Sequence, residues 1–513
     1  MSKNKNLGFE MTDNKVENVV IVGGGTAGWM TAASLVKSLG KTVNFTLVES
    51  SDIGTIGVGE ATIATIRRFY ADLGMSDSEV IKATAATCKL GIEFKNWYTE
   101  DSSFFQPFGL FGQDLGGVGF HHYWNKVRQT GDMTDIGDYS LGVTLAKHGK
   151  FTTPSPNPPS TLSIFDWALH FDASLFAKHL RAYAEGMGVK CIDAKIEDVN
   201  LCPENGFIAS VCLEGGAEIS GDLFIDCSGF RALLIEKTLQ TGFVDWSEWL
   251  QCDRAVAVQS ELNGEPAPYT CSTAHKAGWQ WNIPLQHRCG NGHVYASHHI
   301  SDDEAAHVLT SNIKGKLLDN PRMFKFIPGR REKAWNKNCI AVGLSSGFLE
   351  PLESTSIALV ETAIERIKLL FPDKSMSQGC IDEFNDMARL EYERVRDFII
   401  LHYHATGRDD SPLWAYCRNM SIPETLAHKI KLYKERGHLV KYRWEIFQPA
   451  SWVALYSGNN IVPEAYDPRV DKYELEYLKS SFATMKKALQ DAVGATPTHG
   501  NFIADNCAIS NNA

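Results

Sequence analysis

The feature that most constrains the fold is a glycine-rich turn that follows an apolar run near the N-terminus. Residues 19–22 are apolar and β-branched, which favours a buried parallel strand. Gly23, Gly25 and Gly28 follow at the spacing G-x-G-x-x-G. Residues 29–39, rich in Ala, Leu and Met, predict a helix that ends at Gly40. This order predicts a βαβ unit that binds the phosphates of a dinucleotide at the helix N-terminus.

A second predicted strand, residues 43–48, ends at an acid that can accept hydrogen bonds from ribose hydroxyls. In such a turn the first glycine permits a tight bend, the second a close approach to the pyrophosphate, and the third helix–strand packing. The expected cofactor contacts in this unit are Gly23, Gly25, Thr26, Ala27, Gly28 and Glu49. The alternative is a glycine-rich turn without a ligand, and the motif does not separate FAD from NAD.

Two later segments predict strands that return to the nucleotide-binding sheet. Residues 223–229 form an apolar run that ends in small residues, and residues 339–343 form another. Such returns are typical of a large two-lobed flavoprotein and add Asp226 and Gly343 to the predicted cofactor contacts. The alternative is that both are ordinary buried strands.

Composition and charge exclude several classes of protein. The 50 Lys and Arg residues against 61 Asp and Glu give a net charge of -11, which argues against nucleic-acid binding. No apolar run approaches the ~20 residues of a membrane span, and the polar start lacks a signal core. The 12 cysteines include no Cys-x-x-Cys pair, so we expect reduced thiols, no metal site and a cytoplasmic location.

Four segments together carry a resemblance to a known family. They are GGGTAGWM at 23–30, GVGEAT at 57–62, WQWNIP at 279–284 and GFLEPLEST at 347–355. In this order they resemble the flavin-dependent tryptophan halogenase family, from about residue 18 to about residue 475. The resemblance implies an α/β fold, with a Rossmann-like FAD-binding body of the flavin monooxygenase type, an inserted β-sheet and a helical C-terminal substrate lobe. It adds the cofactor contacts Gly57, Val58, Gly59, Glu60 and Ala61.

The resemblance also implies a two-component enzyme. A separate flavin reductase would supply reduced FAD (FADH2), and halide would attack a flavin hydroperoxide to give hypohalous acid. The oxidant would pass through an internal tunnel to a lysine beside an aromatic substrate, where electrophilic substitution follows. Two rival functions stay open at this point: a flavin-dependent aromatic monooxygenase, and a non-catalytic flavin-binding protein.

Two residues stand at the family's catalytic positions. Lys89 would hydrogen-bond hypohalous acid or form a haloamine, with a pKa tuned by burial. Glu353 would polarise the halogenating species or take the ring proton, and Glu350 is its competitor. The alternatives are a solvated surface lysine and a carboxylate that merely stabilises a helix start.

The second catalytic segment leads into a predicted helix and a predicted halide site. Apolar residues recur between positions 357 and 371 at spacings of three and four, which predicts a helix. Unpaired N–H groups of its first turn, around Thr355 and Ser356, would suit an anion. In the family this region binds chloride or bromide, and many members carry Gly where Ser356 stands. The preference among chloride, bromide and iodide is therefore open.

The tryptophan-rich segment predicts a wall between flavin and substrate. Trp279, Trp281 and Ile283 alternate along a strand and share one face, and Pro284 ends the run. A bulky aromatic wall would keep the arene from the flavin hydroperoxide, so that halide would be the only nucleophile able to reach it. The alternative is an aromatic pair that only fills the core.

The predicted arene pocket rests on two further segments. Gln106, Pro107 and Phe108 match a family segment that usually carries His where Gln106 stands, and Phe108 could stack on an indole. Trp452 is a second aromatic candidate, and Glu353 would complete the pocket. The tyrosines and glutamate that hold free tryptophan in some members do not align with this sequence, so we expect an indole or another electron-rich arene in preference to free tryptophan.

These segments define a predicted domain organisation. Residues 1–16 are expected to be flexible, 17–372 to form the FAD-binding body with inserted β structure, 373–493 to form a helical lobe that caps the substrate, and 494–513 to be a loose tail. Within the lobe, residues 384–396 and 425–436 are helix candidates. A homodimer is a further possibility that the sequence leaves open.

Overall fold

The computed structural model describes residues 14–52 and 60–509. The predicted contacts Gly57, Val58 and Gly59, and residues 1–13 of the predicted flexible N-terminus, lie outside the described residues. No helix in the described ranges is long and apolar enough to cross a membrane.

A six-stranded sheet forms the nucleotide-binding end of the body. Its order is β20-β21-β12-β1-β2-β8, and β1 (Asn18–Val22) pairs in parallel with its neighbours β2 and β12. The two predicted returning strands are β12 and β21, which pair with each other, so that prediction is confirmed. The other strands are β2 (Asn44–Glu49), β8 (Lys190–Asp193), β12 (Leu223–Asp226), β20 (Trp335–Asn336) and β21 (Cys339–Ala341).

Alternate residues of β1 pack on opposite sides of this sheet, as the period of a strand requires. Val19 and Ile21 pack with the buried residues of helices α1 (Thr26–Leu39), α6 (Ala173–Gly186) and α8 (Ser356–Leu369). Val20 and Val22 pack on the opposite side with residues of a small antiparallel sheet. Its strands are β9 (Ile196–Leu201), β10 (Ile208–Leu213) and β11 (Glu218–Ser220).

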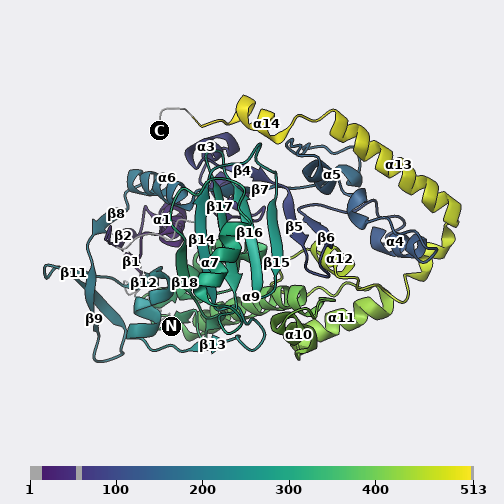
Figure 1. Ribbon diagram of the computed structural model, residues 1–513. Coiled ribbons are helices and arrows are strands. Elements are labelled where there is room, and N and C mark those ends of the chain that lie inside the picture. Colours follow the sequence, from purple (N-terminus) through teal and green to yellow (C-terminus); the bar gives the residue numbers. More distant parts are fainter. Residues whose placement is uncertain (1–13, 53–59, 510–513) are drawn as a thin grey trace, which may run out of the picture.

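A seven-stranded sheet occupies the middle of the molecule (Figure 1). Its order is β18-β14-β17-β16-β15-β5-β6, and every pairing is antiparallel except that of β15 with β5. The predicted tryptophan strand is β16, which lies between β15 and β17 and ends at Pro284 as predicted. The strands are β5 (Gly91–Lys95), β6 (Ser103–Pro107), β14 (Arg254–Ser260), β15 (Thr270–His275), β16 (Gly278–Pro284), β17 (Cys289–Tyr295) and β18 (Arg322–Lys325).

Lys89 ends strand β4 (Thr87–Lys89), which pairs with β7 (Ala168–Phe171) in a three-stranded sheet. The third strand is β3 (Glu60–Ala61), which contains two of the predicted cofactor residues. A single residue, Leu90, separates β4 from β5. Lys89 therefore lies where the chain passes from one sheet into another.

Helices dominate residues 373–493, as predicted. The candidates at 384–396 and 425–436 correspond to α9 (Gln378–His404) and α11 (Glu424–Arg436). Helix α12 (Pro449–Gly458) packs on β6, which brings this lobe onto the large sheet. The remaining helices before residue 420 are α2 (Ile66–Asp72), α3 (Asp77–Ala83), α4 (Phe120–Arg128), α5 (Leu141–Lys147), α7 (Asp302–Ser311) and α10 (Pro412–Asn419).

The C-terminal segment differs from the predicted loose tail. Helix α13 (Leu475–Gly494) runs along α4 and α5 of the body, and α14 (His499–Asn506) follows it (Figure 1). Thr498 caps α14 by accepting a hydrogen bond from the N–H of Asn501, and the side chain of His499 is fully buried. The prediction is wrong for residues 499–506 because a buried side chain anchors a segment whose composition resembles a flexible tail.

The shorter elements connect these layers. A three-stranded sheet has the order β13-β19-β22, with β13 (Phe243–Asp245), β19 (Gly329–Arg331) and β22 (Gly347–Phe348). Short helical turns are η1 (Ile136–Tyr139), η2 (Thr161–Ser163), η3 (Gly229–Arg231), η4 (Leu233–Thr238), η5 (Gly343–Ser345), η6 (Pro351–Glu353) and η7 (Pro468–Lys472).

Candidate active site

Lys89 is fully buried, which excludes the alternative of a solvated surface charge. Its Nζ donates hydrogen bonds of 2.9 Å to the carbonyl oxygen of Thr62 and of 2.9 Å to Oγ of Ser354. The same nitrogen lies 5.2 Å from the ring centroid of Phe108. Burial lowers the pKa of Lys89 to about 7, and the nearby Glu353 carboxylate opposes this shift. The amine is therefore poised to exist in both charged and neutral forms near neutral pH.

Glu353 is buried in the turn that precedes α8 and is held at both carboxylate oxygens. Nε2 of Gln106 donates a 3.0 Å hydrogen bond to Oε2. Nε2 of His402 lies 2.6 Å from Oε1. The structure thus brings together three of the predicted residues, Lys89, Gln106 and Glu353, since Lys89 bonds to the residue that follows Glu353.

His402 is a functional candidate that the sequence reasoning did not select. Its Nδ1 lies 2.9 Å from the carbonyl oxygen of Phe398, which can only accept, so Nδ1 carries a proton. Its Nε2 lies 2.6 Å from Oε1 of Glu353, so an imidazole and a carboxylate are in direct contact within the buried site. The available signal was a histidine at the end of the apolar run 398–401.

Glu350, the competitor of Glu353, has a different set of contacts. Its Oε1 accepts hydrogen bonds from Nε1 of Trp279 at 3.0 Å and from the hydroxyl of Tyr403 at 2.7 Å. Burial raises its pKa to about 7, although both hydrogen bonds oppose the shift. Glu350 thus fixes one indole of the tryptophan strand and ties it to helix α9.

The tryptophan strand presents two buried rings side by side. The centroids of Trp279 and Trp281 are 6.0 Å apart at an interplanar angle of 54°. Gly292 on β17 lies opposite Trp281, and a Cβ there would come within 2.0 Å of its ring. The strand reaches the lysine side through Pro284, whose carbonyl oxygen accepts a 2.6 Å hydrogen bond from Oγ1 of Thr87. Ile283 is buried as well.

The predicted halide residues lie at the start of α8. Ser354 adopts a left-handed conformation with φ of 57°, and Thr355 is the residue that precedes the helix. No side chain caps this helix, and Oγ1 of Thr355 is buried without a hydrogen-bond partner among the described residues. Ser356 is the first residue of the helix. An unpaired hydroxyl beside free first-turn N–H groups suits an anion.

The glycine turn after β1 has the shape that a dinucleotide requires. Gly23 has φ of +113°, and a Cβ there would lie 2.3 Å from the carbonyl oxygen of Cys227. A Cβ on Gly28 would lie 1.8 Å from the carbonyl oxygen of Gly23, so this glycine lets α1 pack closely on the turn. At Gly25 no described atom lies within 4 Å of such a Cβ, which leaves access for a pyrophosphate at the start of α1. Thr26 and Ala27 form the first turn of that helix.

Glu49 ends β2 beside this turn, as predicted. A Cβ on Gly24 would lie 1.5 Å from its Oε2, so the carboxylate reaches the glycine turn itself. Nη1 of Arg181 donates a 2.6 Å hydrogen bond to Oε1, and Nε1 of Trp29 lies 3.4 Å from Oε2. These contacts fix the orientation of the carboxylate beside the glycine turn.

Asp226 and Gly343 differ in their fit to the predicted role. Asp226 is fully buried and accepts hydrogen bonds from its own chain at both oxygens. Oδ1 accepts from the N–H and hydroxyl of Ser228, and Oδ2 accepts from the N–H groups of Leu234 and Ile235 at 2.8 Å each. The carboxylate thus shapes the turn after β12, and these contacts do not support direct contact with a cofactor. Gly343 has φ of +74° and adjoins Ala27, so it lies beside the glycine turn.

Trp452 and Pro107 complete the predicted arene residues. Trp452 lies on α12 and is buried, with its ring 4.8 Å from that of Phe398 and 4.2 Å from Nζ of Lys429. Phe398 also contacts the ring of His402 at 5.2 Å, so an aromatic chain joins Trp452 to the partner of Glu353. Pro107 is buried at the end of β6.

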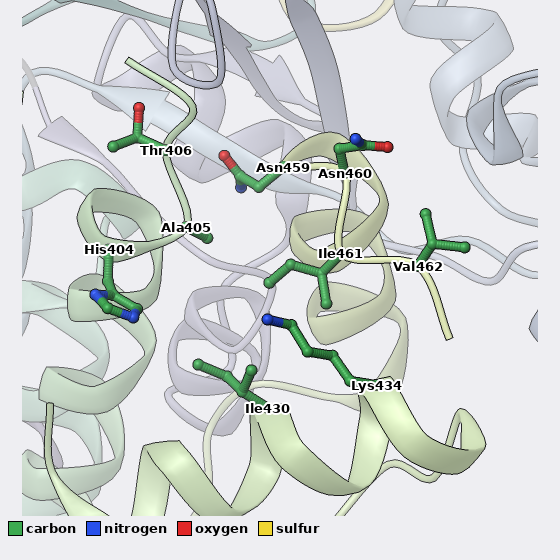
Figure 2. A pocket seen from close by; sticks show the side chains of 9 residues that line it. All are labelled: His404, Ala405, Thr406, Ile430, Lys434, Asn459, Asn460, Ile461 and Val462. Carbon is green, nitrogen blue, oxygen red and sulfur yellow. The ribbon is translucent and has the colours of Figure 1, made fainter. Parts of the chain in front are cut away.

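A separate groove of about 360 Å³ lies in the helical lobe, where α9 and α12 end (Figure 2). The side chain of Lys434 extends from α11 into it, toward Ile461. None of the predicted site residues that the structure describes lines this groove. Its lining residues are His404, Ala405, Thr406, Ile430, Lys434, Asn459, Asn460, Ile461 and Val462.

Comparison with known proteins agrees with this geometry. The structure superposes on BrvH, a flavin-dependent halogenase from Brevundimonas sp. BAL3, with a TM-score of 0.94 and 56% identity, over 97% of this chain and 100% of that one. A flavin-dependent halogenase from Xanthomonas campestris gives a TM-score of 0.93 and 42% identity, over 97% and 99%. The fold and site therefore define a flavin-dependent halogenase, which is an enzyme.

Comparison of the sequence with known families and proteins identifies the family of halogenases to which the chain belongs. The family model described as tryptophan halogenase matches residues 18–474. The tryptophan 6-halogenase ThaL of Streptomyces albogriseolus is 36% identical over 444 residues, which cover 82% of each chain. The chain belongs to the tryptophan halogenase family, as the sequence motifs predicted.

Proposed function

We propose that this enzyme halogenates an indole or another electron-rich arene with hypohalous acid that is made from halide and delivered at Lys89. The observation that carries the proposal is the link between the two predicted catalytic residues. The buried amine of Lys89 bonds to Ser354, and the adjacent Glu353 carboxylate is held by Gln106 and His402. A buried amine and a buried carboxylate at one place provide a halogen carrier and a proton acceptor.

The cofactor fits at the carboxyl end of the six-stranded sheet. Gly23, Gly25 and Gly28 would cradle the FAD pyrophosphate at the N-terminus of α1, and Glu49 would accept from the ribose. Bound reduced flavin supplies, with oxygen, the two-electron oxidation that turns halide into hypohalous acid. Glu60 and Ala61 on β3 lead directly to Thr62, whose carbonyl oxygen holds Lys89. The segment that contains Glu60 and Ala61 is therefore connected to Lys89 by a direct hydrogen bond.

The residues of the chain can then carry the halogen and the proton. A neutral Lys89 amine reacts with hypohalous acid to form an N–X bond and release water, whereas a charged amine donates a hydrogen bond to the acid. From the N–X bond, the ring carbon takes X⁺ and the nitrogen takes up a proton to return as the amine. From hypohalous acid, the ring carbon takes X⁺ and the hydroxide leaves as water with a proton from the charged amine. In either case the ring carbon then loses its proton. Glu353 is placed to accept this proton, and His402 at 2.6 Å can share it.

The wall and the halide site would keep the chemistry selective. The proposed barrier consists of the buried residues Trp279, Trp281, Ile283 and Pro284. Glu350 anchors it by accepting a hydrogen bond from Trp279. The unpaired hydroxyl of Thr355 and the first-turn N–H groups at Ser356 would hold chloride, bromide or iodide. We further propose that a separate flavin reductase supplies the reduced FAD. The enzyme would act in the cytoplasm and could form a homodimer.

The direct test reconstitutes the enzyme with FAD, NADH, a flavin reductase and a panel of indoles and phenols. Chloride, bromide and iodide are offered together, and products are identified by mass spectrometry. We expect a monohalogenated arene whose formation requires halide. A hydroxylated product that forms equally without halide would establish the monooxygenase alternative instead. Flavin oxidation without any arene product would support a non-catalytic flavoprotein.

A further inference from the structure

We propose that the carboxamide oxygen of Gln106 accepts a hydrogen bond from an N–H or O–H group on the substrate ring and thereby selects arenes that carry such a donor. The inference rests on the proposed function and names the chemistry that this site recognises. Gln106 lies on β6 and is only 3% exposed. Its Oε1 has no hydrogen-bond partner among the residues that the structure describes.

The orientation of the Gln106 amide follows from its neighbour. Its other terminal atom lies 3.0 Å from Oε2 of Glu353. An ionised carboxylate can only accept, so Oε2 acts as an acceptor toward Gln106. An acceptor requires the NH₂ end of the amide. Oε1 of Gln106 is therefore the atom turned away from Glu353, where it lacks a donor.

A buried carbonyl oxygen without a donor is unfavourable, and such groups are rare unless a ligand or water completes them. Phe108 follows β6 directly, and it and Gln106 approach the same cluster: Gln106 contacts Glu353, and Nζ of Lys89 bonds to the adjacent Ser354. The ring of Phe108 lies 5.2 Å from Nζ of Lys89. An arene stacked on Phe108 beside Lys89 would therefore lie next to the unpaired oxygen of Gln106.

The chemistry of the ligand follows from that of the acceptor. The N–H of an indole or pyrrole, or the O–H of a phenol, satisfies a carbonyl oxygen. An N-methylated indole or a phenyl ether offers no donor and would leave Oε1 buried and unpaired. A site built around a hydrogen bond rejects such analogues more strongly than a purely apolar pocket rejects a change of size.

The test measures binding to the flavin-free protein by isothermal titration calorimetry, so that it needs neither halide nor turnover. The probes are indole against 1-methylindole, and phenol against anisole. We expect the donor-bearing member of each pair to bind about tenfold more tightly. In Gln106→Leu the two members of each pair should bind with about equal affinity. The matched control is Gln280→Leu, which replaces another buried glutamine, on β16, that does not contact Glu353 and should keep the preference.

Several outcomes would overturn the inference. They are equal affinity within both pairs, no binding of either donor-bearing probe, or a preference that survives in Gln106→Leu, which would indicate a steric effect of the methyl group. Gln106→Met replaces Gln106→Leu if the leucine variant has a lowered Tm. An enzyme that halogenates and binds 1-methylindole as well as indole would keep the proposed function and exclude this role of Gln106. Failure of halogenation with the binding preference intact would exclude the proposed function and keep this role of Gln106.

Discussion

The backbone N–H of Cys88 donates a 3.1 Å hydrogen bond to Nε2 of His499, a residue 411 positions later in the chain. The other ring nitrogen, Nδ1, lies 2.8 Å from the carbonyl oxygen of Pro266 and donates to it. His499 is thus a neutral, buried imidazole that supports the strand on which Lys89 is the next residue. The last helix among the described residues, α14, therefore supports the strand that carries Lys89, the proposed catalytic amine.

We expect His499→Leu to destabilise the protein and to lower halogenation. The buried N–H of Cys88 would lose its acceptor, at a cost of about 1–3 kcal/mol. Thermal unfolding monitored by circular dichroism and product formation under saturating substrate would measure the two effects. His499→Gln can retain an acceptor for this N–H and serves as the matched control. A leucine variant with unchanged Tm and unchanged turnover would show that the contact is dispensable.

The same histidine predicts a loss of stability in acid. Burial lowers the pKa of His499 to about 4, below the value of about 6.5 expected in the unfolded chain. The unfolded state therefore binds more protons between about pH 6.5 and 4, so stability falls as the pH falls through this window. The Tm difference between the wild type and His499→Gln should shift in favour of the variant from pH 7 to pH 5. A constant difference would contradict the neutral, buried state of this histidine.

Replacing Lys89 should separate oxidant formation from halogen transfer. We expect Lys89→Ala and the more nearly isosteric Lys89→Met to abolish ring halogenation but to retain flavin oxidation and release free hypohalite. A diketone trap would detect the hypohalite, while mass spectrometry follows the arene. Normal halogenation by either variant would exclude the lysine from the transfer.

The buried amine also predicts a pH dependence of halogenation. With a pKa lowered to about 7, the neutral form of Lys89 increases from a minor to a major species between pH 6 and pH 8. If transfer proceeds through a haloamine, the rate of halogenation should rise over this interval and level off above it. Lys89→Arg, which stays charged throughout, should be inactive. A rate that falls with rising pH would indicate that the charged amine acts by hydrogen bonding instead.

The two neighbouring glutamates should respond differently to the same substitution. Glu353→Gln is expected to lower turnover at least tenfold with the fold intact, because an amide cannot accept the ring proton. Glu350→Gln should mainly change stability. Burial raises the pKa of Glu350 to about 7, so the wild type loses stability relative to Glu350→Gln as the pH rises from about 4.5 to 7. Unchanged turnover in Glu353→Gln, together with a loss in Glu350→Gln, would move the catalytic role to Glu350.

Local patterns allowed much of the body to be predicted. The glycine turn, its flanking strands and helix α1 depend on residues close together in the chain, and so does the alternation of Trp279, Trp281 and Ile283. The helix after Glu353 could also be predicted, because apolar spacing reports the buried face of a helix directly. The positions of Lys89 and Glu353 came from the family resemblance.

By itself, then, the sequence determined the secondary structure of the cofactor unit, the wall strand and the family, because each is encoded over short stretches of residues. Only the tertiary structure decided that Gln106 and His402 contact opposite oxygens of Glu353. It likewise decided that Asp226 shapes a turn, and that the buried side chain of His499 anchors the segment predicted to be a loose tail. The contacts of Glu353 and His499 join residues that lie far apart in the chain. No local pattern predicts them, because their free energy arises only when distant segments exclude water together. The contacts of Asp226 are local, but the sequence pattern does not distinguish a carboxylate that shapes a turn from one that faces a cofactor.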